Sequence, residues 1–335
     1  MNKVTVIGID LAKNVFQLSS LNNRQKQLLN RRFNRQGLMT YMAQHPACEV
    51  GLEACGSAHY WGRKFTDMGH RVKLLPPAYV KGLVYGNKND VNDAKAIALA
   101  AAQDESPTVA IKSSDQLALQ ALMRIRQRRV EQRKRCANQI RGLLYEHGVV
   151  MKTGIGEIRH IVVETLPIEI RSLIGELVEE FTALSEYVKT SQHQVDRLVK
   201  SHPIGQRLLT IPGFGVLNSL AALIVNPADF HNGRHYAAYL GLVPKQSGTG
   251  GKVRIGGMSK RGNRYHRQLI CHGARSFLCR SRNHRDPLWQ WARHIQLKKG
   301  TNLAVGALAN KLCRISWRVL NDPNGYDSRL SVSPR

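Results

Sequence analysis

The sequence predicts an α/β domain followed by two mainly helical regions. Three observations predict it: strand-like and helix-like segments alternate over about the first hundred residues, apolar residues then recur at helical spacing, and a basic, glycine-rich stretch follows Pro203. A chain of 335 residues is too long for one ordinary core, so two or three domains are expected. We expect them over residues 1–112, 113–202 and 203–321, with a tail over residues 322–335.

The first domain alternates between short apolar runs and amphipathic segments, with turn residues between them. Three successive strands followed by helix, strand, helix, strand and helix is the order of the RNase H-like fold, although other α/β domains begin in a similar way. The sugar-kinase and actin fold also has a Gly-Ile-Asp strand and is the rival. The predicted strands cover residues 4–9, 14–21, 27–33, 48–53 and 71–75, and the predicted helices cover residues 37–44, 57–68 and an alanine-rich segment from about residue 90.

The middle of the chain has a different pattern. Between about residues 114 and 201, apolar residues such as Leu119 and Leu122 recur at near-helical spacing. The pattern is broken by the stretch 148–156 and by Pro167. The sequence therefore predicts two long helices that form an antiparallel helical hairpin or coiled coil between the other two domains.

The charge of the chain is strongly positive. Lys and Arg number 50 against 23 Asp and Glu, which gives a formal net charge of +27. Such an excess predicts DNA or RNA as a partner, with an affinity that falls steeply as salt rises. No apolar run approaches the roughly 20 residues that a membrane-spanning helix needs, so no membrane partner is expected. The six cysteines are scattered without zinc-ligand spacing, which indicates free thiols in a reducing cytoplasm.

Four carboxylates stand out against this positive charge. Asp10 directly follows the first predicted strand and Glu53 ends the fourth. Asp90 and Asp93 open a helix one turn apart, so that both project from one face. Acids gathered in one pocket repel each other unless cations neutralise them. Mg²⁺ suits such a pocket, and a pair of ions about 3.5–4 Å apart suits in-line phosphoryl transfer. Taken singly, Asp90 could instead be the N-cap of its helix.

A run of basic residues lies on the first long predicted helix, with only Glu131 as an acidic neighbour. Such a run is often a solvated helix face, but uncompensated repulsion here favours a nucleic-acid strand alongside. The basic residues are Arg124, Arg126, Arg128, Arg129, Arg133, Lys134, Arg135 and Arg141.

Two glycine-rich segments follow. Residues 208–215, with Gly213 and Gly215, precede a short apolar helix and resemble the phosphate-binding turn of helix-hairpin-helix modules, or are a plain turn. Residues 241–263 bring hydroxyls beside cations, as in a loop that presses Ser247 or Thr249 against a phosphate, or in a flexible phosphate-binding loop without covalent chemistry. The cations that would neutralise the phosphate are Lys252, Arg254, Lys260, Arg261, Arg264 and Arg267.

With these motifs in place, the sequence resembles the DEDD-type insertion-sequence transposases, the family that includes the Piv DNA invertases. The resemblance covers nearly the whole chain. It rests on Gly-Ile-Asp10-Leu-Ala-Lys-Asn, Glu53-Ala-Cys-Gly, Gly-Asn-Lys-Asn-Asp90-Val-Asn-Asp93-Ala-Lys, Ile-Pro-Gly-Phe-Gly, and the late Gly-Gly-Lys and Ser-Lys-Arg-Gly-Asn segments. In combination these motifs are highly specific.

The resemblance implies a RuvC-like first domain whose four acids bind Mg²⁺, a central coiled coil that makes a homo-oligomer (a dimer or tetramer), and a C-terminal transposase domain with a nucleophilic serine. It also implies that a noncoding RNA from the element guides recombination of donor and target DNA in the bacterial cytoplasm, at the nucleoid. Spacing from Pro244 matches the family serine to Thr249, whereas residue type favours Ser247, which we prefer because a primary hydroxyl is less hindered. The alternatives are a RuvC-like nuclease that uses water as nucleophile and a non-catalytic nucleic-acid-binding protein.

Overall fold

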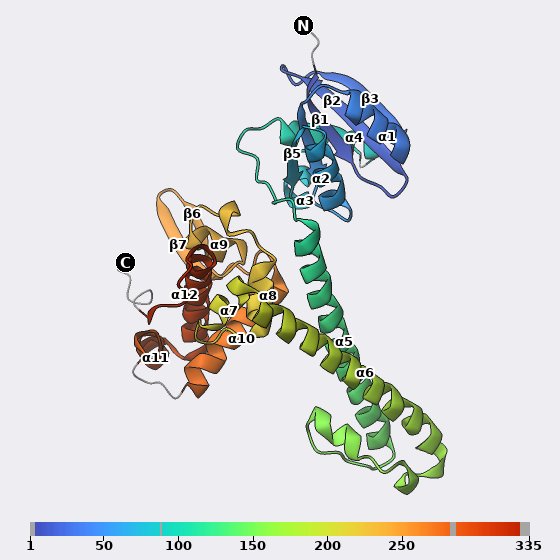
Figure 1. Ribbon diagram of the computed structural model, residues 1–335, viewed down its shortest axis with the longest axis vertical. Coiled ribbons are helices and arrows are strands. Elements are labelled where there is room, and N and C mark those ends of the chain that lie inside the picture. The colour runs from blue at the N-terminus through green and yellow to red at the C-terminus, as the bar shows by residue number, and fades with distance from the viewer. Residues whose placement is uncertain (1–3, 88, 282–285, 329–335) are drawn as a thin grey trace. The chain divides into compact units, whose positions relative to one another are not determined.

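The computed structural model describes residues 4–87, 89–281 and 286–328 (Figure 1). The chain divides into two compact units, Met1–Asp115 and Gln116–Arg335. Within those described ranges, no helix combines the length and the apolar character that crossing a membrane requires. Residues 329–335 of the predicted tail lie outside the described residues.

A five-stranded mixed sheet organises the first unit. Its strand order is β3-β2-β1-β4-β5: β2 pairs antiparallel with both β1 and β3, whereas β4 pairs parallel with both β1 and β5. All five predicted strands are confirmed, and their ends lie within one residue of the predicted ends. The strands are β1 (Val4–Asp10), β2 (Val15–Asn22), β3 (Gln27–Asn34), β4 (Glu49–Glu53) and β5 (Arg71–Leu75).

Helices cover both faces of this sheet. Side chains of α1 and α2 pack on the face that carries Ile7 and Ile9, and α4 packs on the face that carries Val6. Because side chains alternate along a strand, Gly8 and Asp10 lie on the α4 face as well. The helices are α1 (Arg35–Gln44), α2 (Ala58–Asp67), α3 (Pro77–Lys81) and α4 (Asp90–Ala101).

The start of α4 is fixed by its cap. The Asn89 side chain accepts a hydrogen bond from the Asn92 N–H at 2.8 Å, so Asn89 is the N-cap. The alternative that Asp90 caps this helix is therefore wrong. Asp90 and Asp93 both belong to the first turn, where their carboxylates are free of that role.

Two glycines let α4 lie directly on the backbone of the sheet. A Cβ at Gly8 would overlap the backbone of Ala94 and Ala98, and a Cβ at Gly51 would lie 2.6 Å from Ala101 Cβ. Any larger residue at either strand position would push the helix away. The alanine-rich composition of α4 is the matching feature on the helix, and together they fix the height of α4 above β1 and β4.

The predicted pair of long helices is confirmed as α5 (Ser114–Glu146), whose first two residues fall in the first unit, and α6 (Ile168–Ser201). They run antiparallel: Arg126 Nε donates to Gln192 Oε1 at 2.8 Å, and Cys136 Sγ donates to Leu177 O at 3.3 Å. The connecting segment contains two short 3-10 turns, η1 (Ile155–His160) and η2 (Val163–Thr165). Figure 1 shows the two helices side by side along the hairpin.

The base of this hairpin shares a core with the helices that follow it. Met123, Val195 and Val199 pack with Leu220 and Ala221. The domain boundary predicted at residues 202 and 203 thus lies inside one compact unit and stays a prediction. The later elements are α7 (Pro203–Leu209), α8 (Val216–Leu223), η3 (Pro227–Asp229), α9 (Gly233–Tyr239), β6 (Pro244–Thr249), β7 (Lys252–Met258), α10 (Arg264–Arg280), α11 (Pro287–Lys299) and α12 (Thr301–Asn321).

Candidate functional site

Three elements of the first unit carry the four acids to one edge of the sheet. β1 and β4 are parallel neighbours that pair Ile9 with Leu52, so Asp10 and Glu53 end their strands side by side. Both lie on the α4 face, because Gly8 and Gly51 two residues earlier face that helix. Asp90 and Asp93 lie in the first turn of α4.

The other three acids interact electrostatically with Asp10. Burial, followed by the charges of Asp93, Asp90 and Glu53 in that order of size, raises the pKa of Asp10 to about 6, against the lowering effect of a backbone hydrogen bond at Leu11. A carboxyl in this position is costly to ionise near neutral pH. Its ionised form would be stabilised by a cation bound among the four acids.

The donor chemistry fits a hard divalent cation, because Mg²⁺ prefers carboxylate oxygens together with water and phosphate oxygens. However, among the residues that the structure describes, no three His, Cys, Asp or Glu side chains meet closely enough to hold a metal ion together. The carboxylates are therefore within range of one another's fields but do not form a closed cage. Bound cations would have to draw them inward.

A polar row on β2 and β3 supports the acids and was missed by the sequence reasoning. Gln17 lies opposite Asp10 in the strand register, and Arg32 lies opposite Gln17. Arg32 Nε donates to Gln17 Oε1 at 3.3 Å, and its Nη2 lies 3.7 Å from Asp90 Oδ2. Asn30 Nδ2 donates to Val91 O at 3.2 Å. The signal in the sequence was a set of polar residues inside strands, but only the register shows that they reach α4.

The basic residues of α5 fall into two groups. Arg126 and Arg129 bond across the hairpin, Arg129 Nη1 donating to Ser191 Oγ at 2.6 Å and its guanidinium stacking on Tyr187 at 5.2 Å from the ring centre. Burial, together with Arg159 and Arg126, lowers the pKa of Arg133. Arg141 bonds to the Gly154 carbonyl. The residues that remain exposed on the helix are Arg124, Arg128, Lys134 and Arg135.

The two glycines of the predicted phosphate-binding turn have different surroundings. Gly213 has a φ of +78°, and a Cβ there would lie 2.7 Å from Gly273 O, so α10 occupies the space that a side chain would need. Gly215 is the N-cap of α8, and none of the described residues places an atom of another segment within 4 Å of its Cβ position. Close packing against α10 therefore explains Gly213, whereas Gly215 faces open space.

The hydroxyls and cations of the later segment lie on an exposed two-stranded ribbon. The register pairs Ser247 with Arg254 and Thr249 with Lys252, so these four side chains share one face. Gly250 and Gly251, with φ values of +56° and +79°, make the turn. Every residue from 244 to 257 is exposed.

Hydrogen bonds to backbone carbonyls fix the segment that follows the ribbon. Arg267, which is 9% exposed, donates to Leu240 O and Arg261 O, both at 2.8 Å, and the Lys260 N–H donates to Gly241 O at 3.1 Å. Arg267 is thus a structural residue and not a free cation. The side chains of Lys260, Arg261 and Arg264 are exposed.

Two family models match the chain: a DEDD-type transposase model over residues 7–148 and the transposase family IS116/IS110/IS902 over residues 205–290. A probable family 20 transposase of Pseudomonas aeruginosa is 36% identical, over 96% of this chain and 98% of its own length. The transposase for insertion sequence element IS1328 of Yersinia enterocolitica is 35% identical, over 95% and 97%. A pilin gene-inverting protein of Moraxella bovis is 25% identical, over 97% and 98%.

Proposed function

This chain belongs to the transposase family IS116/IS110/IS902, an enzyme family that cleaves and rejoins DNA, and on that premise we propose which of its residues perform the reaction. The acids of the first unit hold divalent metal, and a hydroxyl of the β6–β7 ribbon attacks the DNA. The observation that carries the proposal is geometric: parallel β1 and β4 end at Asp10 and Glu53 on the face that α4 covers, and the first turn of α4 holds Asp90 and Asp93. Isolated structural carboxylates would not gather in this way in a chain of net charge +27.

The first unit is an RNase H-like, RuvC-like domain in this proposal. Its support is the strand order β3-β2-β1-β4-β5 with an antiparallel meander followed by two parallel strands. In such a sheet the carboxyl ends of β1 and β4 meet at one edge, where α4 also begins. This edge is where Asp10, Glu53, Asp90 and Asp93 would hold two Mg²⁺ ions.

Bound Mg²⁺ would supply Lewis-acid stabilisation of the charge that builds up on the phosphodiester. The protein's own part is to orient the four carboxylates: strand ends fix Asp10 and Glu53, and the first turn of α4 fixes Asp90 and Asp93. Arg32 on β3, which also donates to Gln17, pairs with the Asp90 carboxylate.

The nucleophile is the hydroxyl of Ser247. Its oxygen bonds to the phosphorus as one bridging phosphorus–oxygen bond breaks. The hydroxyl proton passes to water, and the departing deoxyribose oxygen takes a proton from water. The serine phosphodiester keeps the energy of the broken bond, so attack by the hydroxyl of another strand rejoins DNA. Lys252 and Arg254 on the same face of the ribbon neutralise the phosphate. Thr249 shares this face and is the alternative nucleophile.

The partners are donor and target DNA and a noncoding guide RNA, bound by a homo-oligomer. A polyanionic partner is supported by the net charge and by the exposed Lys and Arg side chains on α5 and after the ribbon. Gly215 at the open start of α8 can admit one further phosphate. The positive surface gives affinity, and base pairing by the RNA gives the choice of sequence.

Trapping of a covalent protein–DNA adduct tests this proposal. The full-length protein, with the RNA that copurifies with it and Mg²⁺, is incubated with a nicked substrate and analysed under denaturing conditions. We expect an adduct with the wild type and Thr249→Ala and none with Ser247→Ala. Asp10→Ala should fold and bind RNA but lose cleavage. If both hydroxyl variants cut normally, water is the nucleophile and the protein acts as a RuvC-like nuclease; wild-type cleavage by Asp10→Ala rejects the metal site.

A further inference from the structure

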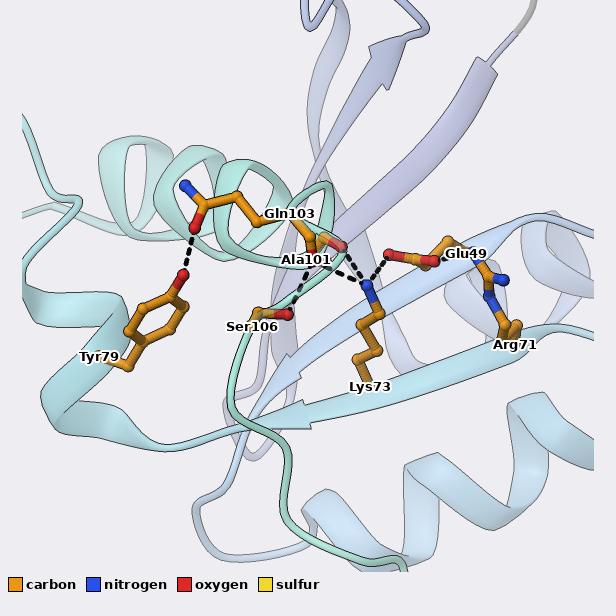
Figure 2. A network of polar contacts seen from close by, with 7 residues as sticks. All are labelled: Glu49, Arg71, Lys73, Tyr79, Ala101, Gln103 and Ser106. Carbon is orange, nitrogen blue, oxygen red and sulfur yellow. Dashed lines mark hydrogen bonds and ion pairs between the residues drawn. The ribbon is translucent and has the colours of Figure 1, made fainter.

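The end of α4 remote from the acids is fastened to the sheet by one lysine (Figure 2). Lys73, on β5, bonds to three groups at once. Its ammonium donates to Ala101 O at 2.8 Å and to Gln103 O at 3.0 Å, and it pairs with Glu49 Oε1 at 2.7 Å. The Lys73 side chain is 15% exposed and that of Glu49 is 7% exposed. The same ammonium therefore pairs with a buried carboxylate and bonds to the end of the helix.

The charges explain why this fastening is firm. A buried carboxylate such as Glu49 requires a partner, and removing one partner of a buried pair is strongly destabilising. The carbonyls at the end of a helix carry partial negative charge, which an ammonium stabilises. Lys73 satisfies both demands. Arg71 also pairs with Glu49, but its side chain is 77% exposed, and of these two cations Lys73 is the one that bonds to the end of α4.

The position of the last turn of α4 also determines the position of its first turn, which carries Asp90 and Asp93. α4 has 12 residues and is therefore about 18 Å long. It touches the sheet backbone at Gly8 through Ala94 and Ala98, between its two ends. If its last turn lifts from β5, the helix tilts about that contact, and the first turn with Asp90 and Asp93 moves relative to Asp10.

We propose that Lys73, held by Glu49, is a positioning residue for the acid site: it clamps the last turn of α4 so that Asp90 and Asp93 face Asp10 and Glu53. This inference rests on the proposed function, because the acids matter only if they hold metal. It assigns a role in the reaction to residues at the opposite end of the helix from the chemistry.

The test compares three full-length variants with the wild type. Lys73→Met removes the clamp, and Arg71→Met is the matched control because it removes a cation from Glu49 without touching α4. The double variant Glu49→Gln/Lys73→Met has no unpaired buried charge, so it remains informative if Lys73→Met folds poorly. Two measurements are made: hydrogen exchange of the α4 amides without metal, and the Mg²⁺ concentration at the midpoint of the thermal shift.

For Lys73→Met we expect faster exchange along α4 and a Mg²⁺ midpoint about tenfold higher, the scale on which groups that orient metal ligands act. Arg71→Met should match the wild type in both. The double variant should recover melting temperature but keep the raised midpoint and the fast exchange. Wild-type exchange and midpoint in Lys73→Met, or their full recovery in the double variant, overturns the proposal. Absence of any Mg²⁺ response in the wild type instead rejects the metal site, and the exchange data still decide the clamp.

Discussion

Asp10 is a carboxylate whose charge the fold disfavours. Its pKa in the folded chain is about 6 against a usual 3.8, because of burial first and then Asp93, Asp90 and Glu53. Between these two values the folded state binds more protons than the unfolded state. The contribution of Asp10 to stability is therefore fully present below about pH 4 and is lost as pH rises through about 6. At neutral pH the metal-free protein carries an electrostatic strain at this residue.

Asp10→Asn should relieve that strain. Without metal, we expect the variant to melt a few degrees above the wild type at about pH 7.5 and no higher than the wild type at about pH 4, where Asp10 is protonated. The shift is small because water partly screens the half-exposed group. Added Mg²⁺ should stabilise the wild type and have little effect on the variant. Thermal melts at the two pH values check this, and a lower melting temperature for Asp10→Asn at pH 7.5 contradicts it.

Sequence reasoning proposed the four acids as a site but did not identify the residues that contact them or their helix. Asp10, Glu53, Asp90 and Asp93 stand next to local signals, namely strand ends and a helix start. Arg32 and Lys73 contact groups that are distant in sequence, so their roles depend on strand register and on the docking of α4. Asp90 was a reasonable N-cap for α4 because aspartate is a good capping residue, but in the structure the Asn89 side chain takes that role.

At the scale of elements, the charge pattern of α5 predicts a basic helix but not the direction in which each side chain points. In the structure, some residues of the basic run bond to α6, and the others are exposed to solvent. Which residues turn inward depends on partners such as Ser191 and Tyr187, some sixty residues later. The strands were predicted to within one residue, because their short apolar runs are bounded by turn residues such as Asn22, Asn23, Pro76 and Pro77. The two long helices were predicted for a similar reason, since glycines and Pro167 interrupt their periodicity.

Arg129→Met and Arg128→Met form a matched pair for this division. Losing the Arg129 bonds to Ser191 and Tyr187 should reduce the free energy of unfolding by about 1–2 kcal/mol. Replacing the exposed Arg128 should change it by less than about 0.5 kcal/mol but reduce the salt dependence of nucleic-acid binding by about one counterion. Urea unfolding and salt titrations of binding measure the two effects. Equal stability losses, or an unchanged salt slope in Arg128→Met, would contradict the assignment.

At the scale of the molecule, the two compact units have separate cores. One surrounds the five-stranded sheet, and the largest of the others joins α7–α12. The shared core at the base of the α5–α6 hairpin was beyond sequence reasoning, because Met123 and Leu220 lie nearly a hundred residues apart. Helical periodicity shows that a face is apolar but not which partner covers it.

Calorimetry should resolve two unfolding transitions, one for each unit. Mg²⁺ at about 100 times its dissociation constant stabilises a binding site by about 2.7 kcal/mol, and we expect that gain only in the transition of the first unit. Hydrogen exchange assigns each transition to its residues. A Mg²⁺ shift confined to the second unit would place the metal elsewhere, and Asp10→Ala, which should show no shift, is the control.

The exposure of the whole ribbon from residue 244 to 257 has a practical consequence. No side chain there is enclosed by the fold, so residues such as Lys245, Val253 and Ile255 can be exchanged with little risk to expression or solubility. A library restricted to this stretch would let directed evolution search for altered strand-joining behaviour with most members still folded. Differences in activity among the folded members would then reflect changes in how the ribbon contacts the DNA substrate.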